Sequence, residues 1–170
     1  MSVQHKVTVE LGERAYEIII GSGVLARAAT HIAPLLLRPK LAIVADANLA
    51  ENHLPVLRAA LNDVGITHDS YLVPSGESSK NFQQLGDLCD WLLAKKIERN
   101  DCIIAVGGGV IGDLTGFAAA NIYFQRGVVI YRRSDLHQFG QFRLDILAFQ
   151  QWPFIRLFVD AAHQFVKRHI

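Results

Sequence analysis

The sequence predicts an α/β domain, with a Rossmann-like parallel sheet flanked by helices and an N-terminal β-hairpin. Short apolar runs of strand type alternate with amphipathic segments of helical period along most of the chain, as is typical of parallel β/α sheets. A glycine-rich segment, residues 106–113, joins one of these runs to a helix, as it does in nucleotide-binding folds. The 170 residues suffice for one domain, or for one domain and part of another.

Composition narrows the class of function. Hydrophobic residues make up 51% of the chain and charged residues 19%, which excludes a disordered protein. The 17 Lys and Arg residues balance 16 Asp and Glu residues, so no basic excess favours nucleic acid or a membrane surface as partner. Cys89 and Cys102 fit neither a metal-ligand spacing nor a disulfide scaffold, and we find no signal or membrane-spanning segment. We expect a cytoplasmic protein that binds a small molecule.

The first elements follow from local patterns. Residues 7–11 and 16–20 have strand composition and predict the hairpin. Apolar residues recur at helical spacing over 25–36, where Pro34 should kink or shorten the helix. Residues 41–45 form an apolar run of the kind that is buried on both faces of a parallel sheet.

The remaining elements of the predicted sheet continue the alternation. The pattern predicts a helix from Leu54 to the stop at Gly65, with Pro55 in its first turn. A strand at 69–73 comes next. A helix follows the strand at 69–73, and Lys95 and Lys96 should complement the negative end of its dipole at the C-terminus. Its apolar face is made of Phe82, Leu85, Leu88, Cys89, Leu92 and Leu93. A buried strand at 102–106 and a helix through 114–120 complete the pattern.

The glycine-rich segment carries the clearest functional signal. Gly107, Gly109 and Gly112 satisfy the pattern G-x-G-x-x-G, in which backbone N–H groups at a helix N-terminus approach a pyrophosphate that a Cβ would exclude. The standard pattern follows the first strand of its domain, whereas this one comes after at least two β/α units. A glycine-rich turn without a ligand therefore remains an alternative.

Two further polar loops follow strand ends. They are Asp46-Ala-Asn48 and Ser75-Gly-Glu-Ser-Ser-Lys80, and each alone is also compatible with a helix cap. The carboxyl ends of parallel strands meet at one edge of a sheet, so the three loops together predict a nucleotide crevice. It would offer a carboxylate to ribose hydroxyls, a lysine for charge and a glycine turn to phosphate.

Four segments resemble the sugar-phosphate cyclases and, among them, most closely the 3-dehydroquinate synthases. These segments are Leu11–Arg14, Pro74–Lys80, Gly107–Ala120 and Gln125–Val128. The continuation Asp-Leu-Thr-Gly-Phe after the glycines resembles the cyclases, whereas iron-dependent alcohol dehydrogenases and glycerol dehydrogenases share only the general fold and a glycine-rich loop. The resemblance covers about the first 128 residues.

The resemblance implies a cytoplasmic, NAD-dependent lyase of the shikimate pathway. Such an enzyme converts 3-deoxy-arabino-heptulosonate 7-phosphate to 3-dehydroquinate and phosphate, needs a divalent metal (zinc or cobalt), and is a homodimer at full length. The metal ligands of the family belong to a C-terminal helical domain, which we do not find in this chain, so no metal ligand is assigned.

The resemblance also implies the roles of particular residues. Asp46 and Asn48 would meet the cofactor, Asp113 would meet a ribose, and Arg126 would bind the substrate phosphate. The other implied cofactor contacts lie in the two longer loops. The first loop would hold the adenosine end through Ser75, Gly76, Glu77, Ser78, Ser79 and Lys80. The second would hold the pyrophosphate through Gly108, Gly109, Val110, Ile111 and Gly112.

Residues 129–170 differ from the body of the chain, so we expect domains at 1–128 and 129–170. The second segment holds a single glycine, Gly140, and its apolar stripe from Phe154 to Val166 predicts partial helix. It does not show the buried strand or the threonine, serine and lysine motifs with which the family continues. We hypothesise a reading-frame change or a truncation, which would leave an inactive form of the synthase. A non-catalytic nucleotide-binding remnant, a cyclase for another seven-carbon sugar phosphate, and self-association through the tail are the alternatives.

Overall fold

The computed structural model describes residues 4–10, 15–98, 100–121, 128–134 and 144–150. The strands are β1 (Gln4–Val9), β2 (Tyr16–Gly21), β3 (Lys40–Asp46), β4 (Thr67–Val73), β5 (Cys102–Val106), β6 (Val128–Ser134) and β7 (Leu144–Gln150). The α-helices are α1 (Ala28–Ile32), α2 (Ala47–Asp63), α3 (Phe82–Ala94) and α4 (Gly109–Asn121), and the short 3-10 helices are η2 (Leu25–Arg27), η3 (Ala33–Leu35) and η4 (Glu77–Ser79).

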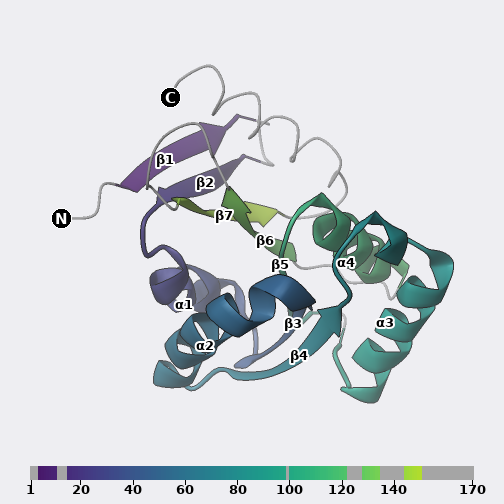
Figure 1. Ribbon diagram of the computed structural model, residues 1–170. Helices are drawn as coiled ribbons and strands as arrows, with labels where there is room; N and C mark the ends of the chain where they lie inside the picture. The colour runs from purple at the N-terminus through teal and green to yellow at the C-terminus, as the bar shows by residue number, and fades with distance from the viewer. Residues whose placement is uncertain (1–3, 11–14, 99, 122–127, 135–143, 151–170) are drawn as a thin grey trace.

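The seven strands within the described residues belong to one sheet, in the order β1-β2-β7-β6-β5-β3-β4 (Figure 1). The neighbours β6, β5, β3 and β4 run parallel to one another. Strand β7 is antiparallel to both β6 and β2, and it joins the parallel strands to the hairpin of β1 and β2. The predicted fold class, a Rossmann-like parallel sheet with an N-terminal hairpin, is confirmed.

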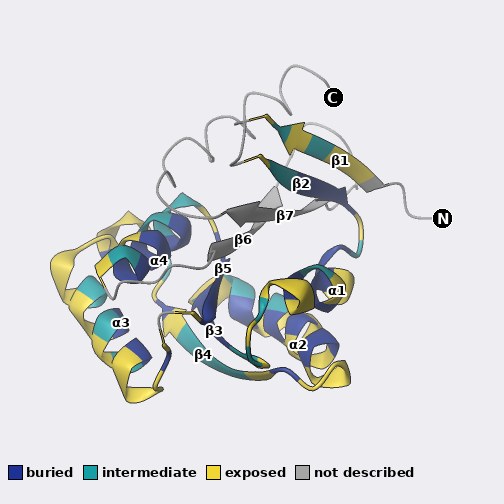
Figure 2. Ribbon diagram, turned by 180° about the vertical axis from the view of Figure 1, so that it is seen from behind, coloured by how far each residue is buried: buried dark blue, intermediate teal, exposed yellow. Residues whose placement is uncertain are grey.

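Helices cover both faces of the parallel strands. Helices α1 and α2 lie on one face, and α3 and α4 lie on the other (Figure 1). Along β3, Leu41 and Ile43 pack in the cluster with α2, whereas Ala42 and Val44 pack in the cluster with α3 and α4. Both sets are fully buried, as Figure 2 shows for the centre of the sheet. Burial on both sides explains why this strand is an uninterrupted apolar run in the sequence.

Pro34 divides the first predicted helix as expected. The segment predicted as one helix over 25–36 consists of η2, α1 and η3 in succession, and Pro34 lies in η3. Ala28 and Ile32 of α1 are buried in the same cluster as Leu57 of α2. The short helices η2 and α1 therefore still pack their apolar side against the sheet, as the helical spacing of the apolar residues predicted.

Helix α2 begins seven residues before its predicted start. The sequence interpretation placed the start at Leu54, but the helix begins at Ala47 and contains Pro55 in its interior. Asp46 caps its first turn, because its carboxylate accepts a hydrogen bond of 2.9 Å from Asn48 N–H. Pro55 is exposed, and on the solvent face of a helix water can take the place of the hydrogen bond that a proline removes. The predicted start at Leu54 is wrong for this reason.

Helix α3 buries a narrower face than its periodicity predicts. Leu88 and Leu92 are fully buried, and Leu85 packs partly buried beside them. Phe82 and Leu93 are instead 86% and 58% exposed. The predicted apolar face is therefore wrong at Phe82 and at Leu93, which lies on the solvent side of the helix beside the buried Leu92.

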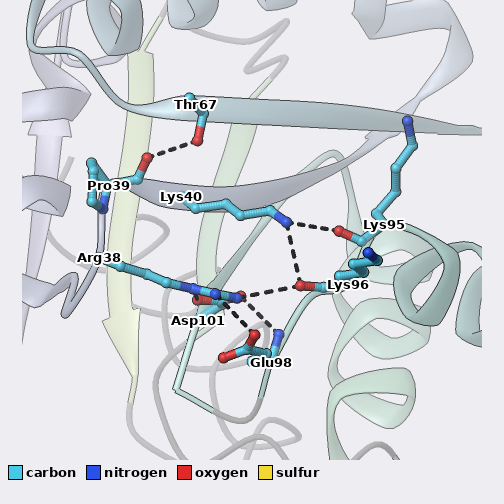
Figure 3. Close-up of polar contacts among 8 residues, drawn as sticks. All are labelled: Arg38, Pro39, Lys40, Thr67, Lys95, Lys96, Glu98 and Asp101. Atoms are coloured by element: carbon cyan, nitrogen blue, oxygen red, sulfur yellow. Dashed lines mark hydrogen bonds and ion pairs between the residues drawn. The ribbon is translucent and has the colours of Figure 1, made fainter.

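The cation at the C-terminus of α3 comes from strand β3. Lys40 donates from Nζ to the backbone carbonyls of Lys95 at 2.8 Å and of Lys96 at 3.3 Å (Figure 3). The sequence predicted that Lys95 and Lys96 would themselves complement this helix end. The ammonium group of Lys95 instead pairs with Asp69 of β4 at 2.9 Å. Strand β3 and helix α3 are thereby tied together at the amino ends of the parallel strands.

The chain after residue 128 contributes two strands to the sheet. Strand β6 pairs in parallel with β5, with Val129 opposite Ile104, and β7 pairs with β2, with Leu147 opposite Ile19. This differs from the expectation that no such strand follows residue 128. Val128, Val129 and Ile130 are β-branched, and β6 is the next described element after α4 along the chain, where a parallel sheet takes its next strand. The stripe from Phe154 to Val166 lies outside the described residues.

Candidate nucleotide-binding site

The order of the strands creates a topological switch point between β3 and β5. From β3 the chain passes through α2 to β4 on one side, and from β4 it returns past β3 to β5 on the other side. Helices α2 and α4, which follow β3 and β5, accordingly lie on opposite faces. In open parallel sheets, ligands bind outside the carboxyl ends of the strands at such a point.

The register brings the carboxyl ends of the three strands level with one another. Ala45 of β3 lies opposite Val106 of β5, and Asp46 lies opposite Val73 of β4. The loop that follows each of these strands therefore starts at the same edge of the sheet. This is the edge at which the sequence predicted that the three polar loops converge.

The first contact between these loops joins Ser75 to the N-terminus of α2. The hydroxyl of Ser75 donates a hydrogen bond to Asp46 Oδ1. Asn48 N–H is 2.9 Å from the same carboxylate oxygen and 3.3 Å from Ser75 Oγ. Asp46 thus has the capping role that the sequence left open, and it also receives a hydrogen bond from the neighbouring loop.

The loop after β4 is braced from within. Gly76 has a φ of +111°, a conformation that side chains other than glycine rarely adopt. Ser79 is buried, and its hydroxyl donates to the backbone carbonyl of Pro74 at 2.6 Å. Of the residues predicted to contact the cofactor in this loop, Ser79 therefore has its hydroxyl engaged in holding the loop, whereas Glu77 and Ser78 are exposed.

The second contact between loops is the ion pair of Lys80 and Asp113. Lys80 Nζ is 2.7 Å from Asp113 Oδ2 in α4 and 3.9 Å from Glu77 Oε1. Both partners are partly exposed, and an exposed pair contributes only about 0–1 kcal/mol to folding. The pair does, however, place the ammonium group of Lys80 beside the carboxylate of Asp113, which is the one carboxylate in the first two turns of α4. Without this cation, a phosphate bound at the helix N-terminus would meet uncompensated negative charge.

Two adjacent glycines at the end of β5 have different reasons to be glycine. A Cβ on Gly107 would lie 2.4 Å from Ile111 Cγ1, so a side chain there would clash with the helix that follows. A Cβ on Gly108 would meet nothing within 4 Å, and Gly108 is exposed without a positive φ. Neither packing nor backbone conformation therefore requires glycine at 108, and the open space in front of it suits a ligand.

The N-terminus of α4 supplies donors at this space. Gly112 N–H donates to the carbonyl of Gly108 at 3.1 Å, which fixes the first turn. The N–H groups of Gly109, Val110 and Ile111 precede it and have no acceptor within the helix. Such N–H groups, together with the positive end of the helix, bind phosphate oxygens.

Sequence reasoning located the loops but missed two features of the site. It did not identify the switch point, which depends on strand order, or the hydrogen bond of Ser75 to Asp46, which depends on the register of β3 and β4. Arg126, predicted to bind the substrate phosphate, lies outside the described residues. Within the ranges that the structure describes, no three His, Cys, Asp or Glu side chains are grouped so that they could hold a metal ion.

Comparison with known proteins finds similarity to the 3-dehydroquinate synthases. The model of the 3-dehydroquinate synthase N-terminal domain matches residues 70–134. The 3-dehydroquinate synthase of Cereibacter sphaeroides (strain ATCC 17025 / ATH 2.4.3) is 52% identical over 122 residues, which are 72% of this chain and 32% of that synthase. The N-terminal part of this chain is similar in sequence to the 3-dehydroquinate synthases. The resemblance read from the sequence motifs is thereby confirmed, and this chain spans about a third of the length of that synthase.

Two solved structures share this fold. ValA, a 2-epi-5-epi-valiolone synthase from Streptomyces hygroscopicus subsp. jinggangensis 5008 with NAD+ and Zn2+ bound, is 26% identical with a TM-score of 0.50, covering 57% of this chain and 26% of that one. A 2-deoxy-scyllo-inosose synthase complexed with carbaglucose-6-phosphate, NAD+ and Co2+ has a TM-score of 0.62 at 16% identity, covering 76% of this chain and 35% of that one. The second likeness concerns the fold alone. Among the described helices, none has the length and apolar character needed to cross a membrane.

Proposed function

We propose that this chain provides the NAD-binding part of a 3-dehydroquinate synthase. The observation that carries the proposal is the switch point between β3 and β5, where Asp46, Lys80 and Asp113 meet a glycine turn. The open space at Gly108 is what the backbone of a diphosphate-binding turn needs. The match to the synthase N-terminal domain over residues 70–134 supports the same assignment.

The residues present fit a dinucleotide. The N–H groups at the start of α4, residues 108–112, would hold the pyrophosphate, and residues 75–80 would hold the adenosine end. Asp46, Asn48 and Asp113 would accept or donate hydrogen bonds at the ribose hydroxyls and the nicotinamide end. NAD, when bound, supplies a hydride acceptor, and the chain itself supplies orientation and charge.

The activity of the whole synthase is part of the proposal. It is the lyase reaction of the shikimate pathway, in which 3-deoxy-arabino-heptulosonate 7-phosphate yields 3-dehydroquinate and phosphate. Arg126 would bind the substrate phosphate, because its guanidinium group can make two parallel hydrogen bonds to phosphate oxygens. We further propose a homodimer in the cytoplasm, where Cys89 and Cys102, which form no disulfide, would stay reduced. The described residues do not fit a zinc or cobalt site, so no step through a metal is assigned to them.

We also propose that these 170 residues bind NAD without turning over substrate. The chain spans about a third of its relative's length, and proton abstraction and ring closure need a substrate site in addition to the bound cofactor. A non-catalytic nucleotide-binding remnant is thus the second candidate. A cyclase for another seven-carbon sugar phosphate is the third, which the likeness to the valiolone synthase supports.

Calorimetric titration of the purified chain with NAD+ tests the cofactor assignment. We expect saturable binding that weakens by about tenfold or more in Gly108→Ala, because the added Cβ enters the space that a pyrophosphate would occupy. Gly86→Ala is the matched control, since a Cβ there also meets nothing within 4 Å but lies on α3, outside the predicted cofactor loops. No binding at millimolar NAD+, or equal losses in the two variants, would contradict the assignment.

Phosphate release tests whether the chain turns over the substrate of a 3-dehydroquinate synthase. The purified chain is mixed with NAD+, Zn2+ or Co2+, and 3-deoxy-arabino-heptulosonate 7-phosphate, and free phosphate is followed over time. We expect no release above the rate without protein. Sustained turnover would show that the chain is itself a working synthase and that our proposal of inactivity is wrong.

A further inference from the structure

The hydroxyl group of Ser75 makes hydrogen bonds to two groups of the protein itself, the Asp46 carboxylate and Asn48 N–H. A serine hydroxyl has one proton to donate, and Ser75 donates it to Asp46 Oδ1. The same hydroxyl accepts from Asn48 N–H at 3.3 Å, and this N–H is also 2.9 Å from Asp46 Oδ1. The three groups form a closed set of hydrogen bonds that links the loop after β4 to the first turn of α2.

Asp46 keeps one carboxylate oxygen available within this arrangement. Its Oδ1 receives both hydrogen bonds, while no described residue donates to Oδ2. Asp46 is partly exposed at the end of β3, next to the switch point. A carboxylate in such a place typically accepts hydrogen bonds from ribose hydroxyls.

We propose that Ser75 is a positioning residue that holds the Asp46 carboxylate so that Oδ2 faces a ribose hydroxyl of the bound dinucleotide. This proposal rests on the proposed function, and it gives Ser75 a different role from the direct cofactor contact that the family resemblance implies. A direct contact as donor would require Ser75 to release Asp46 Oδ1. The capping bond from Asn48 N–H restrains Oδ1, and the second hydrogen bond to the same oxygen, from Ser75, narrows the remaining rotation of the carboxylate about its Cβ–Cγ bond.

A double-mutant cycle tests the coupling of Ser75 to Asp46. NAD+ affinity is measured by calorimetry for Ser75→Ala, Ser75→Thr, Asp46→Asn and the double variant Ser75→Ala/Asp46→Asn. Loss of one hydrogen bond predicts roughly threefold to tenfold weaker binding for Ser75→Ala, and Ser75→Thr should restore most of the affinity because it keeps the hydroxyl. In the double variant, Ser75→Ala should add no further loss to Asp46→Asn. Fully additive losses would mean that Ser75 contacts the ligand itself, and would overturn the proposal.

Amide hydrogen exchange of the ligand-free chain tests the same contact without NAD+. Ser75→Ala should speed exchange of Asn48 N–H several-fold, whereas Ser75→Thr should leave it unchanged. The control lies in the same spectra, because Gln84 N–H is held by the equivalent cap of Asn81 at 2.8 Å and should not change. Unchanged exchange at Asn48 overturns the proposal whether or not NAD+ binds. Faster exchange in a chain that does not bind NAD+ would establish the contact and refute the proposed function.

Discussion

Arg38 and Asp101 form a two-point ion pair at the amino ends of β3 and β5, opposite the candidate site. Arg38 Nε and Nη2 each lie 2.5 Å from a carboxylate oxygen of Asp101, and Glu98 N–H donates to the same carboxylate at 2.7 Å (Figure 3). The side chain of Asp101 is only 1% exposed. The pair therefore connects the segments that enter two adjacent central strands.

Removal of the guanidinium group should destabilise the fold. Arg38→Ala leaves the buried carboxylate of Asp101 without its charged partner, so we expect the free energy of unfolding to fall by more than the loss of an exposed ion pair would lower it. Urea denaturation followed by circular dichroism measures the change. Lys6→Ala is the control, because Lys6 pairs with Glu17 at 2.6 Å while both side chains are largely exposed, and its loss should cost less than about 1 kcal/mol. Equal effects of the two substitutions would refute this account.

Acid should weaken the same contact. Burial alone would raise the pKa of Asp101, but the hydrogen bonds from Arg38 and from Glu98 N–H hold that pKa below its ordinary value. An aspartate in the unfolded chain titrates near pH 3.9. The stabilisation from a lowered pKa is present above that pH and is lost as the pH falls through the folded-state pKa. Unfolding free energies of the unsubstituted chain and of Asp101→Asn should therefore differ at neutral pH and converge below about pH 4. A constant difference down to pH 3 would show that the charge of Asp101 does not contribute.

The sequence predicted the parts of the fold that depend on local pattern. Strands β3 and β5 were found from apolar runs, because burial on both faces removes polar residues from the strand itself. The convergence of Asp46, Ser75 and Lys80 at one edge followed from the rule that parallel strands end together. These predictions needed no knowledge of which strands are neighbours.

Features that depend on distant pairing could not be predicted in this way. The switch point exists because β5 pairs with β3 rather than with β4, and nothing in either strand's own residues specifies that choice. Pro55 misplaced the start of α2, because sequence alone does not reveal that its helical position faces solvent. The partner of the Ser75 hydroxyl likewise depends on the register that places Asp46 opposite Val73.

The two glycines after β5 should respond differently to alanine. Gly107→Ala places a Cβ 2.4 Å from Ile111 Cγ1 and 2.7 Å from Ile111 Cβ, so the start of α4 must shift, at a cost of about 1–3 kcal/mol. Gly108→Ala meets no neighbour and should unfold at the same or a slightly higher temperature. Differential scanning calorimetry of the two variants compares them. If Gly108→Ala were the less stable, the space at Gly108 would not be open in the folded chain.

The N-terminal hairpin should depend on β7 for its attachment to the sheet. Strand β2 pairs with β1 on one side and with β7 on the other, so β7 is the strand that joins the hairpin to the parallel strands. Leu147 lies opposite both Ile19 and Tyr131 in the ladder. A proline there removes a ladder hydrogen bond from an interior strand, a position that proline does not normally occupy, so the pairing of β7 with its neighbours should weaken.

Hydrogen exchange of Leu147→Pro can locate that loss within the sheet. We expect the amides of Ile18 and Ile20 in β2 to lose protection, while those of Ile43 in β3 stay protected, because β3 is held by β4 and β5. Gln4→Pro is the control, since it lies at the first position of the edge strand β1, where proline is tolerated. Loss of protection in β3 as well would mean that the sheet unfolds as one unit. Unchanged protection of β2 would mean that β7 does not hold the hairpin.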